Sequence, residues 1–180
     1  MTRAADADPE HDLEADPEAV ARQILLRSLS AQPRTRAELA ARLAQRRVPA
    51  SVAERVLDRF EEVGLVDDAA FAHAWVESRH RGRGLSRQAL ARELRQRGVA
   101  DETIGAALDS LDPEFELRSA HILVRRKLDS MAGLEPRVRL RRLAGLLARK
   151  GYPPGLALAV VRAEMEARGD RAAGLSDALE

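Results

Sequence analysis

Histidine and cysteine are the residue types whose chemistry can be tested first from their spacing in this sequence. There is no cysteine, so the chain offers no thiolate nucleophile, no disulfide and no cysteine-bound metal. The histidines have no HExxH or HxH spacing and no accompanying carboxylate cluster; they are His11, His73, His80 and His121. His121 falls in a predicted inward row with Leu117, Val124 and Leu128, which is typical of a partly buried structural histidine. We therefore expect no catalytic residue, no metal site and no cofactor.

Arginine offers the most binding chemistry. The chain has 30 Lys and Arg residues, and only Lys127 and Lys150 are lysines. Guanidinium groups bind phosphates and carboxylates through paired hydrogen bonds. Between residues 79 and 97, seven arginines stand against the single Glu93, and two glycines at 82 and 84 allow the backbone to approach a phosphate or a partner closely. No strand precedes these glycines and no Walker lysine follows, so the sequence does not favour a nucleotide site.

Two groups of basic residues are the predicted contacts with a polyanion such as DNA. The central group is Arg79, Arg81, Arg83, Arg87, Arg92 and Arg95. The second group is Arg139, Arg141, Arg142, Arg149 and Lys150. In the central group, helical spacing points Leu90 and Leu94 inward and the arginines outward. A solvated helix face beside a flexible corner is the alternative interpretation of this group.

An internal repeat supplies the elements that position these residues. RAELAARLAQRRV (36–48) and RQALARELRQRGV (87–99) lie 51 residues apart and are identical at seven of thirteen positions. A third copy follows 53 residues later, where Leu143, Leu147 and Gly151 match Leu90, Leu94 and Gly98. The sequence thus predicts tandem copies of one helical unit.

Each copy has the pattern of three helices. In the first, helices begin at Pro17, after Thr35 and at Ala50, and the last ends before Gly64. In the second copy, a helix begins after residues 67–68 and places Phe71 and Trp75 in the core. The segment 81–84 breaks this helix, and further helices begin at Ser86 and Asp101. In the third, the expected helices are 113–128, 136–150 and 154–168.

Composition agrees with an all-α fold. The chain of 180 residues is 45% hydrophobic and 33% charged but only 3% aromatic, and no segment alternates as a strand does. We predict three tandem three-helix repeats stacked into an elongated, curved rod. The predicted parts are an acidic disordered tail (1–18), repeats at 19–65, 66–112 and 113–168, and a flexible C-terminal tail (169–180). No apolar run is long enough for a membrane span, and the N-terminus lacks a secretory signal, so we expect a cytoplasmic protein.

Charge differs between the helices of each copy in a regular way. The middle helices carry net charges of +3 (35–47), +3 (86–97) and +6 (136–150), whereas the third helices are net negative, with −2 (50–63), −3 (101–109) and −1 (154–167). Stacked copies would therefore form a basic stripe suited to an extended polyanion. The acidic third helix would be the recognition helix of a helix-turn-helix protein, so base reading in the major groove is disfavoured. A helix-turn-helix transcriptional regulator and a helical scaffold without nucleic acid remain the alternatives.

Four segments carry a family resemblance. RAELAARL (36–43), GLVDDAAFAHAWVESR (64–79), RGRGLSRQALARELRQRGV (81–99) and RRLAGLLARKGYPPGLALAVV (141–161) resemble the RecX family of bacterial regulators of the RecA recombinase, over residues 19–167. The third copy departs from the pattern at 153–155, where Pro-Pro-Gly replaces a polar helix cap.

The resemblance implies a non-enzymatic monomer that modulates DNA repair, recombination and the SOS response. Its partners would be the RecA filament and the backbone phosphates of single- and double-stranded DNA. It would inhibit filament extension, strand exchange and the coupled ATP hydrolysis.

Overall fold

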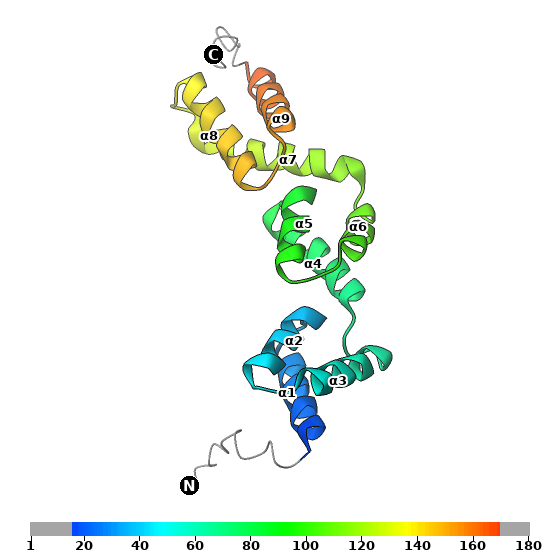
Figure 1. The fold of residues 1–180 in the computed structure, drawn as a ribbon. Helices are drawn as coiled ribbons and strands as arrows, with labels where there is room; N and C mark the ends of the chain where they lie inside the picture. The colour runs from blue at the N-terminus through cyan, green and yellow to red at the C-terminus, as the bar shows by residue number, and fades with distance from the viewer. Residues whose placement is uncertain (1–15, 170–180) are drawn as a thin grey trace, which may run out of the picture. The chain divides into compact units, whose positions relative to one another are not determined.

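The computed structural model describes residues 16–169, and in this range nine α-helices and one short 3-10 helix follow one another without a strand. The helices are α1 (Pro17–Ala31), α2 (Arg36–Gln45), α3 (Ala50–Glu62), α4 (Asp68–Arg83), α5 (Arg87–Gln96), α6 (Asp101–Asp109), α7 (Pro113–Leu128), η2 (Asp129–Met131), α8 (Pro136–Arg149) and α9 (Pro154–Ala167). The predicted all-α fold of three three-helix copies is confirmed (Figure 1). None of the helices in this range has both the length and the apolar content of a bilayer span.

Both predicted tails lie mainly outside the described residues. The predicted tail 1–18 extends too far, because Pro17 and Glu18 form the first turn of α1, and the helix start predicted at Pro17 is confirmed. The Asp16 carboxylate accepts a hydrogen bond from the Glu18 N–H and so caps this helix. The rod-like stacking of the copies and the boundaries between them stay predictions.

Local sequence signals explain where most helices begin. Thr35 accepts a hydrogen bond from the Glu38 N–H, and the Glu38 carboxylate accepts one from the Thr35 N–H, which completes a capping box at the start of α2. Asp112 caps α7, where Pro113 occupies the first turn. These are the positions that the sequence predicts.

The predicted break of α4 at 81–84 is confirmed, and it lies at the end of that segment. The helix continues through Gly82 to Arg83 and ends at Gly84, which has φ +58°. A single glycine inside a helix costs only about 1 kcal/mol relative to alanine, so Gly82 does not stop the helix. A glycine in the left-handed conformation does stop it.

The chain divides into two compact units. Among the described residues, the first joins 16–72 to Arg95–Thr103, and the second joins His73–Leu94 to 104–169. In the first unit α1, α2 and α3 pack on one another (Figure 1). Their core includes Leu25, Leu39 and Leu43, each fully buried. Burying a leucine side chain contributes about 2 kcal/mol, so these contacts hold the three helices together.

In the second unit α8 and α9 lie side by side and α7 crosses them (Figure 1). Leu143 and Leu147 of α8, Val161 of α9 and Val124 of α7 meet in its core. Leu117 is 42% exposed, so it does not belong to the inward row of α7 that the sequence predicts. The packed face of α7 begins at Ala120. This packing leaves the charged side of α8 toward solvent.

Candidate nucleic-acid interface

The corner between α4 and α5 is held against the turn between α8 and α9, all within the second unit. The Ser86 N–H donates to the carbonyl oxygen of Lys150 (3.0 Å), and the Tyr152 hydroxyl donates to that of Gly84 (3.1 Å). The Lys150 ammonium group donates to the carbonyl oxygen of Arg83. The two predicted groups of basic residues therefore meet at Arg83 and Lys150.

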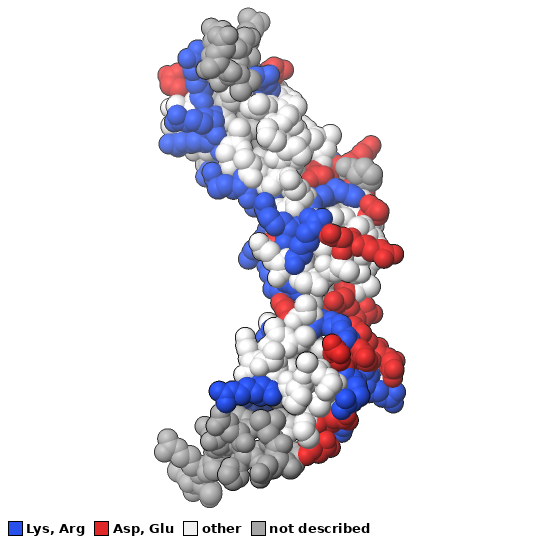
Figure 2. Space-filling model, in the orientation of Figure 1, with Lys and Arg blue, Asp and Glu red and all other residues white. Residues whose placement is uncertain are grey.

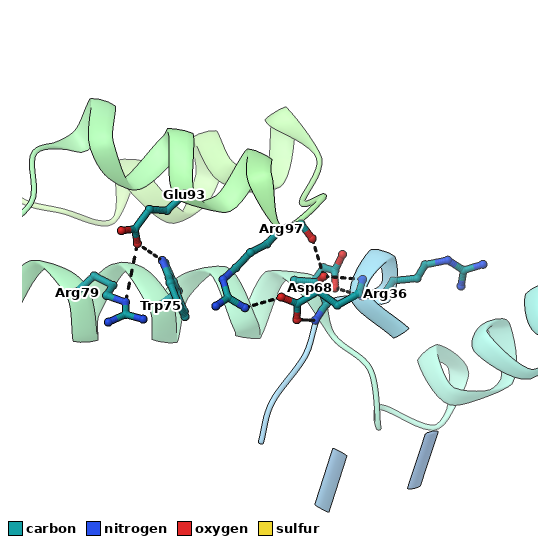
Figure 3. A network of polar contacts seen from close by, with 8 residues as sticks. Arg36, Asp68, Trp75, Arg79, Glu93 and Arg97 are labelled. Atoms are coloured by element: carbon teal, nitrogen blue, oxygen red, sulfur yellow. Dashed lines mark hydrogen bonds and ion pairs between the residues drawn. The ribbon is translucent and has the colours of Figure 1, made fainter. Parts of the chain in front are cut away.

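Arg79, in the central group, is committed to a contact between α4 and α5. Its guanidinium carbon lies 4.0 Å from the centroid of the Trp75 ring, and its Nε lies 3.8 Å from Glu93 Oε2. Trp75 Nε1 donates to the same oxygen across 2.9 Å (Figure 3). Trp75 is half-buried, so its predicted place in the core is wrong: its ring is partly covered by an arginine.

Arg87 also faces carboxylates. Its guanidinium donates to Asp109 Oδ1 (3.0 Å) and to the carbonyl oxygen of Leu111 (3.4 Å). Its backbone N–H donates to Glu116 Oε1 across 2.9 Å. Arg87 therefore ties the start of α5 to α6 and α7, and little of its charge is left for an outside anion.

The first unit repeats the Arg87 contacts at Arg36. The Arg36 guanidinium donates to Asp58 Oδ1 (2.7 Å) and to Glu61 Oε2 (2.6 Å). The backbone N–H of Arg36 donates to Asp68 Oδ1 (2.8 Å). Burial lowers the pKa of Arg36, but the hydrogen bonds and charges of Asp58 and Glu61 outweigh it and raise that pKa overall. The first arginine of the middle helix is thus structural in two copies.

A second contact in the first unit joins α2 to the end of α5. Thr35 Oγ1 donates to the carbonyl oxygen of Arg97 (2.7 Å), and Arg97 donates to Glu38 Oε1 across 2.5 Å (Figure 3). The guanidinium carbon of Arg97 lies 5.6 Å from the centroid of the Phe71 ring. Phe71 is half-buried, so its predicted place in the core is wrong too. These contacts account for the position of Arg97, which the sequence does not place among the contact residues.

The remaining central residues divide into paired and unpaired arginines. Arg81 forms an ion pair with Glu77 on α4. In the first unit, Arg95 Nε lies 2.6 Å from Asp101 Oδ1. Arg83 and Arg92 are exposed, and their side chains form no ion pair with any residue in 16–169. Of the six predicted contacts, these two present an uncompensated charge to solvent.

The second group lies mostly on the exposed side of α8. Arg141, Arg142 and Arg149 are exposed and form no ion pair with the residues that the structure describes, whereas Arg139 is half-buried. Three of these arginines line a hollow of about 390 Å³ together with Lys127, Ser130, Met131 and Leu146. We refer to it as the α7–α8 hollow.

Lys127 is a residue that sequence reasoning missed. It ends the run Arg125-Arg126-Lys127 in the last turn of α7, which is a first helix, whereas the regular charge pattern of the copies concerns their middle and third helices. A run of three cations at the end of a helix was the available signal.

Positive and negative side chains gather over different helices of the second unit. Figure 2 shows Lys and Arg side chains over α8 and α5, and Asp and Glu side chains over α6 and the start of α7. Such a distribution attracts a polyanion to one side of this unit and repels it from the other.

Two of the histidines within residues 16–169 have structural contacts. His121 is half-buried and its Nδ1 lies 2.6 Å from Glu164 Oε1, which confirms its predicted hydrogen-bonded role. His80 is buried, with Nδ1 2.9 Å from the carbonyl oxygen of Leu85 and Nε2 3.0 Å from Ser119 Oγ. Over residues 16–169 there is no group of three or more His, Asp or Glu side chains suited to a metal.

Comparison with known proteins agrees with this three-copy architecture. The family models "RecX, first three-helix domain", "RecX, second three-helix domain" and "RecX, third three-helix domain" match residues 21–60, 67–108 and 114–161. The regulatory protein RecX of Thermobifida fusca is 58% identical over 151 residues, which cover 84% of this chain and 82% of that protein. The chain belongs to the RecX family.

Further RecX relatives extend the match. The regulatory protein RecX of Streptomyces coelicolor is 56% identical over 162 residues, covering 90% of this chain and 86% of that protein. The crystal structure of RecX from Lactobacillus salivarius has a TM-score of 0.75 and 17% identity, covering 83% of this chain and 97% of that one. Identity that low supports the RecX fold alone. The two relatives that match this chain over most of its length are both regulatory proteins of the RecX family.

Proposed function

We propose that this RecX-family chain binds the RecA filament on DNA and inhibits filament extension, strand exchange and the coupled ATP hydrolysis. In this role it acts as a cytoplasmic monomer that modulates DNA repair, recombination and the SOS response, and it is not an enzyme. Its membership in a family of regulatory proteins supports the proposal.

One observation carries the DNA contact. Arg83 and Arg92, and Arg141, Arg142 and Arg149 on α8, are exposed cations without an ion pair among the described residues, although many other arginines are paired. Cations grouped in this way repel one another and attract a polyanion. The net negative charge of the third helices, in turn, disfavours entry into the major groove. The DNA contact is therefore to backbone phosphates.

Binding of this kind depends strongly on salt. With about five to seven phosphate contacts, the affinity for DNA falls by roughly two to four orders of magnitude from about 50 to about 200 mM salt. Sequence preference is small, because phosphates carry no direct sequence information. A sequence-specific footprint would instead indicate a transcriptional regulator.

The deciding experiment is a titration of this chain into preformed RecA filaments while ATP hydrolysis is followed. We expect hydrolysis to fall as the chain is added. Charge reversal by Arg83→Glu with Arg142→Glu relieves inhibition, whereas the control Arg59→Glu, on α3 and paired with Glu62, leaves it in place. Unchanged hydrolysis at saturating wild-type chain contradicts the proposal.

A further inference from the structure

We propose that the α7–α8 hollow is a phosphate-binding site that takes consecutive phosphodiester groups of a nucleic-acid backbone. The inference deepens the proposed function and rests on it, because it assigns the DNA contact to one place in the third copy. The hollow is formed within the second unit by the end of α7, by η2 and by α8.

The residues around the hollow carry charge of one sign. Four of its seven lining residues are cations, and no carboxylate lines it; the cations are Lys127, Arg141, Arg142 and Arg149. None of these four side chains forms an ion pair inside the described range. Grouping unpaired cations around one hollow is unfavourable until an anion lies between them.

Basic residues next to the hollow behave differently. Arg125 Nε lies 2.8 Å from Glu164 Oε1, and Arg168 lies 2.7 Å from Asp129 Oδ1. Carboxylates are therefore present in this part of the second unit and pair with arginines that do not line the hollow. The four lining cations are the ones left for an outside anion.

The helix dipole explains two of the four cations. The carbonyl ends of α7 and α8 attract positive charge, which accounts for Lys127 and Arg149 in their last turns. Arg141 and Arg142 lie in the middle of α8, away from either helix end. A dipole interaction therefore does not explain why all four gather around one space.

The size of the hollow favours more than one phosphate. Arg142 and Arg149 are seven residues apart on α8, which is two turns and about 10 Å along the axis. The hollow measures about 390 Å³, and Met131, which is 5% exposed, forms part of its lining. Arginines spaced in this way along α8 can contact successive phosphates of a backbone.

A basic path leads out of the hollow toward the corner between α4 and α5. Lys150 follows Arg149 directly, and its ammonium group donates to the carbonyl oxygen of Arg83. Arg83 itself is exposed and unpaired among residues 16–169. Lys150 and Arg83 thus place further positive charge beside the turn that follows Arg149, which favours a polymer over a free nucleotide.

The test compares two double variants of the full chain in binding a labelled oligonucleotide of about 20 nucleotides, by fluorescence anisotropy. Arg142→Ala with Arg149→Ala removes two lining cations. Arg22→Ala with Arg27→Ala removes the same charge from α1, where both side chains are exposed and unpaired in the described part of the chain. Circular dichroism melting checks that both variants remain folded.

We expect the hollow variant to weaken binding by about tenfold or more at low salt and to reduce the salt slope by roughly two. The α1 variant stays within about twofold of wild type. Equal losses in the two variants, or no loss in the hollow variant, overturn the assignment of the hollow.

Competition identifies the source of the phosphate. Inorganic pyrophosphate and ATP are added to the oligonucleotide complex of the wild-type chain at matched ionic strength. Displacement only at concentrations far above that of the oligonucleotide supports the nucleic-acid backbone. Displacement at comparable concentrations overturns it in favour of a free polyphosphate.

The same variants, measured also in the RecA hydrolysis assay, distinguish a failure of the hollow assignment from a failure of the proposed function. A hollow variant that binds DNA like wild type overturns the hollow even if the wild-type chain inhibits RecA. A wild-type chain that does not inhibit RecA overturns the proposed function, while a selective loss of DNA binding in the hollow variant still supports the hollow.

Discussion

Arg87 donates a hydrogen bond from its guanidinium to Asp109 across 3.0 Å, and this bond joins the first turn of α5 to the end of α6. Arg36 and Asp58 lie 51 residues earlier in the repeat and form the same bond across 2.7 Å. The pair is therefore shared by the first two copies. The third copy has Leu140 at this position, and this residue is 9% exposed.

Replacing either arginine should destabilise the fold. Arg36→Ala and Arg87→Ala each remove hydrogen bonds from a side chain that is only 31% exposed, so we expect each to lower the free energy of unfolding by about 1 kcal/mol. Arg83→Ala removes an exposed, unpaired side chain and should change it by less than about 0.5 kcal/mol. Urea denaturation measures the three values. A loss as large at Arg83 as at Arg87 would contradict the structural role.

Three glycines with positive φ differ in whether an added Cβ atom would also contact a neighbouring residue. Gly64 (φ +72°) has nothing within 4 Å of an added Cβ. At Gly98 (φ +79°) a Cβ would lie 2.3 Å from that of Ala37, and at Gly151 (φ +85°) it would lie 2.7 Å from that of Ala89. Each contact lies within one compact unit.

Alanine substitutions should therefore form a graded series. Gly64→Ala is expected to cost about 1 kcal/mol from the left-handed backbone alone. The costs at Gly98 and Gly151 should exceed this by about 1 kcal/mol or more, because the neighbouring helix must also move. Gly133, with open space and no positive φ, is the control with no expected loss. Thermal melting ranks the four variants, and equal losses at all three positive-φ glycines would exclude the steric part.

Sequence alone predicts most of the helices, because their ends depend on local signals. Thr35, Asp112 and Pro113 are recognisable as helix-start residues from their types and positions in the sequence, and the structure places helix starts there. The end of α4 is harder to predict, because Gly82 and Gly84 look alike in sequence and only Gly84 adopts positive φ. Packing of Gly84 next to Leu123 of α7 is a tertiary feature that no local pattern reveals.

The candidate site is less predictable, because free charge depends on which carboxylates lie nearby. A count of arginines treats Arg79 and Arg83 as equally available for an outside anion. However, Glu93 lies beside Arg79, whereas Arg83 has no carboxylate partner among the described residues. The repeat did contain a usable signal for Arg87, since an arginine and an aspartate recur at the same offset. Lys127 joins the site only through the packing of α7 on α8.

Tyr152 provides a spectroscopic test of the packing between the α8–α9 turn and the corner after α4. Burial, with a contribution from the charge of Glu116, raises the pKa of Tyr152 to about 12 from an ordinary value of 10.0. A raised folded-state pKa means that the stability from Tyr152 is complete below pH 10.0 and is lost as the pH rises toward about 12. Tyr152 is the one tyrosine of the sequence, so tyrosinate absorbance reports it alone.

We expect a tyrosinate titration of the native chain with its midpoint well above pH 10, and a return to about 10 in concentrated urea. Tyr152→Phe abolishes the signal and, by removing the hydrogen bond to Gly84, lowers the free energy of unfolding by about 1 kcal/mol at neutral pH. A native midpoint equal to the one in urea would show that the hydroxyl is not buried at this corner.

Glu164 links α9 to α7 through hydrogen bonds from His121 and Arg125. Burial raises the pKa of the Glu164 carboxyl, but these two hydrogen bonds and the charge of Arg125 outweigh burial and lower that pKa overall. Because the pKa is lower in the folded state than in the unfolded state, the stabilisation is present above the ordinary carboxyl range and is lost as the pH falls through the folded-state value.

Glu164→Gln should therefore destabilise the chain in a pH-dependent way. Above the ordinary carboxyl pKa we expect it to lower the free energy of unfolding by about 2 kcal/mol, because a buried carboxylate loses two charge-assisted hydrogen bonds. The difference from wild type should shrink as the pH falls from the ordinary carboxyl range through the lower folded-state pKa of Glu164, since the wild-type carboxyl then becomes protonated as well. Glu166→Gln changes the same charge at an exposed neighbouring position of α9 and should leave stability unchanged. Urea denaturation of the three chains across this pH range measures the difference, and a gap that stays constant down to pH values below the folded-state pKa would show that the carboxylate charge does not stabilise the junction.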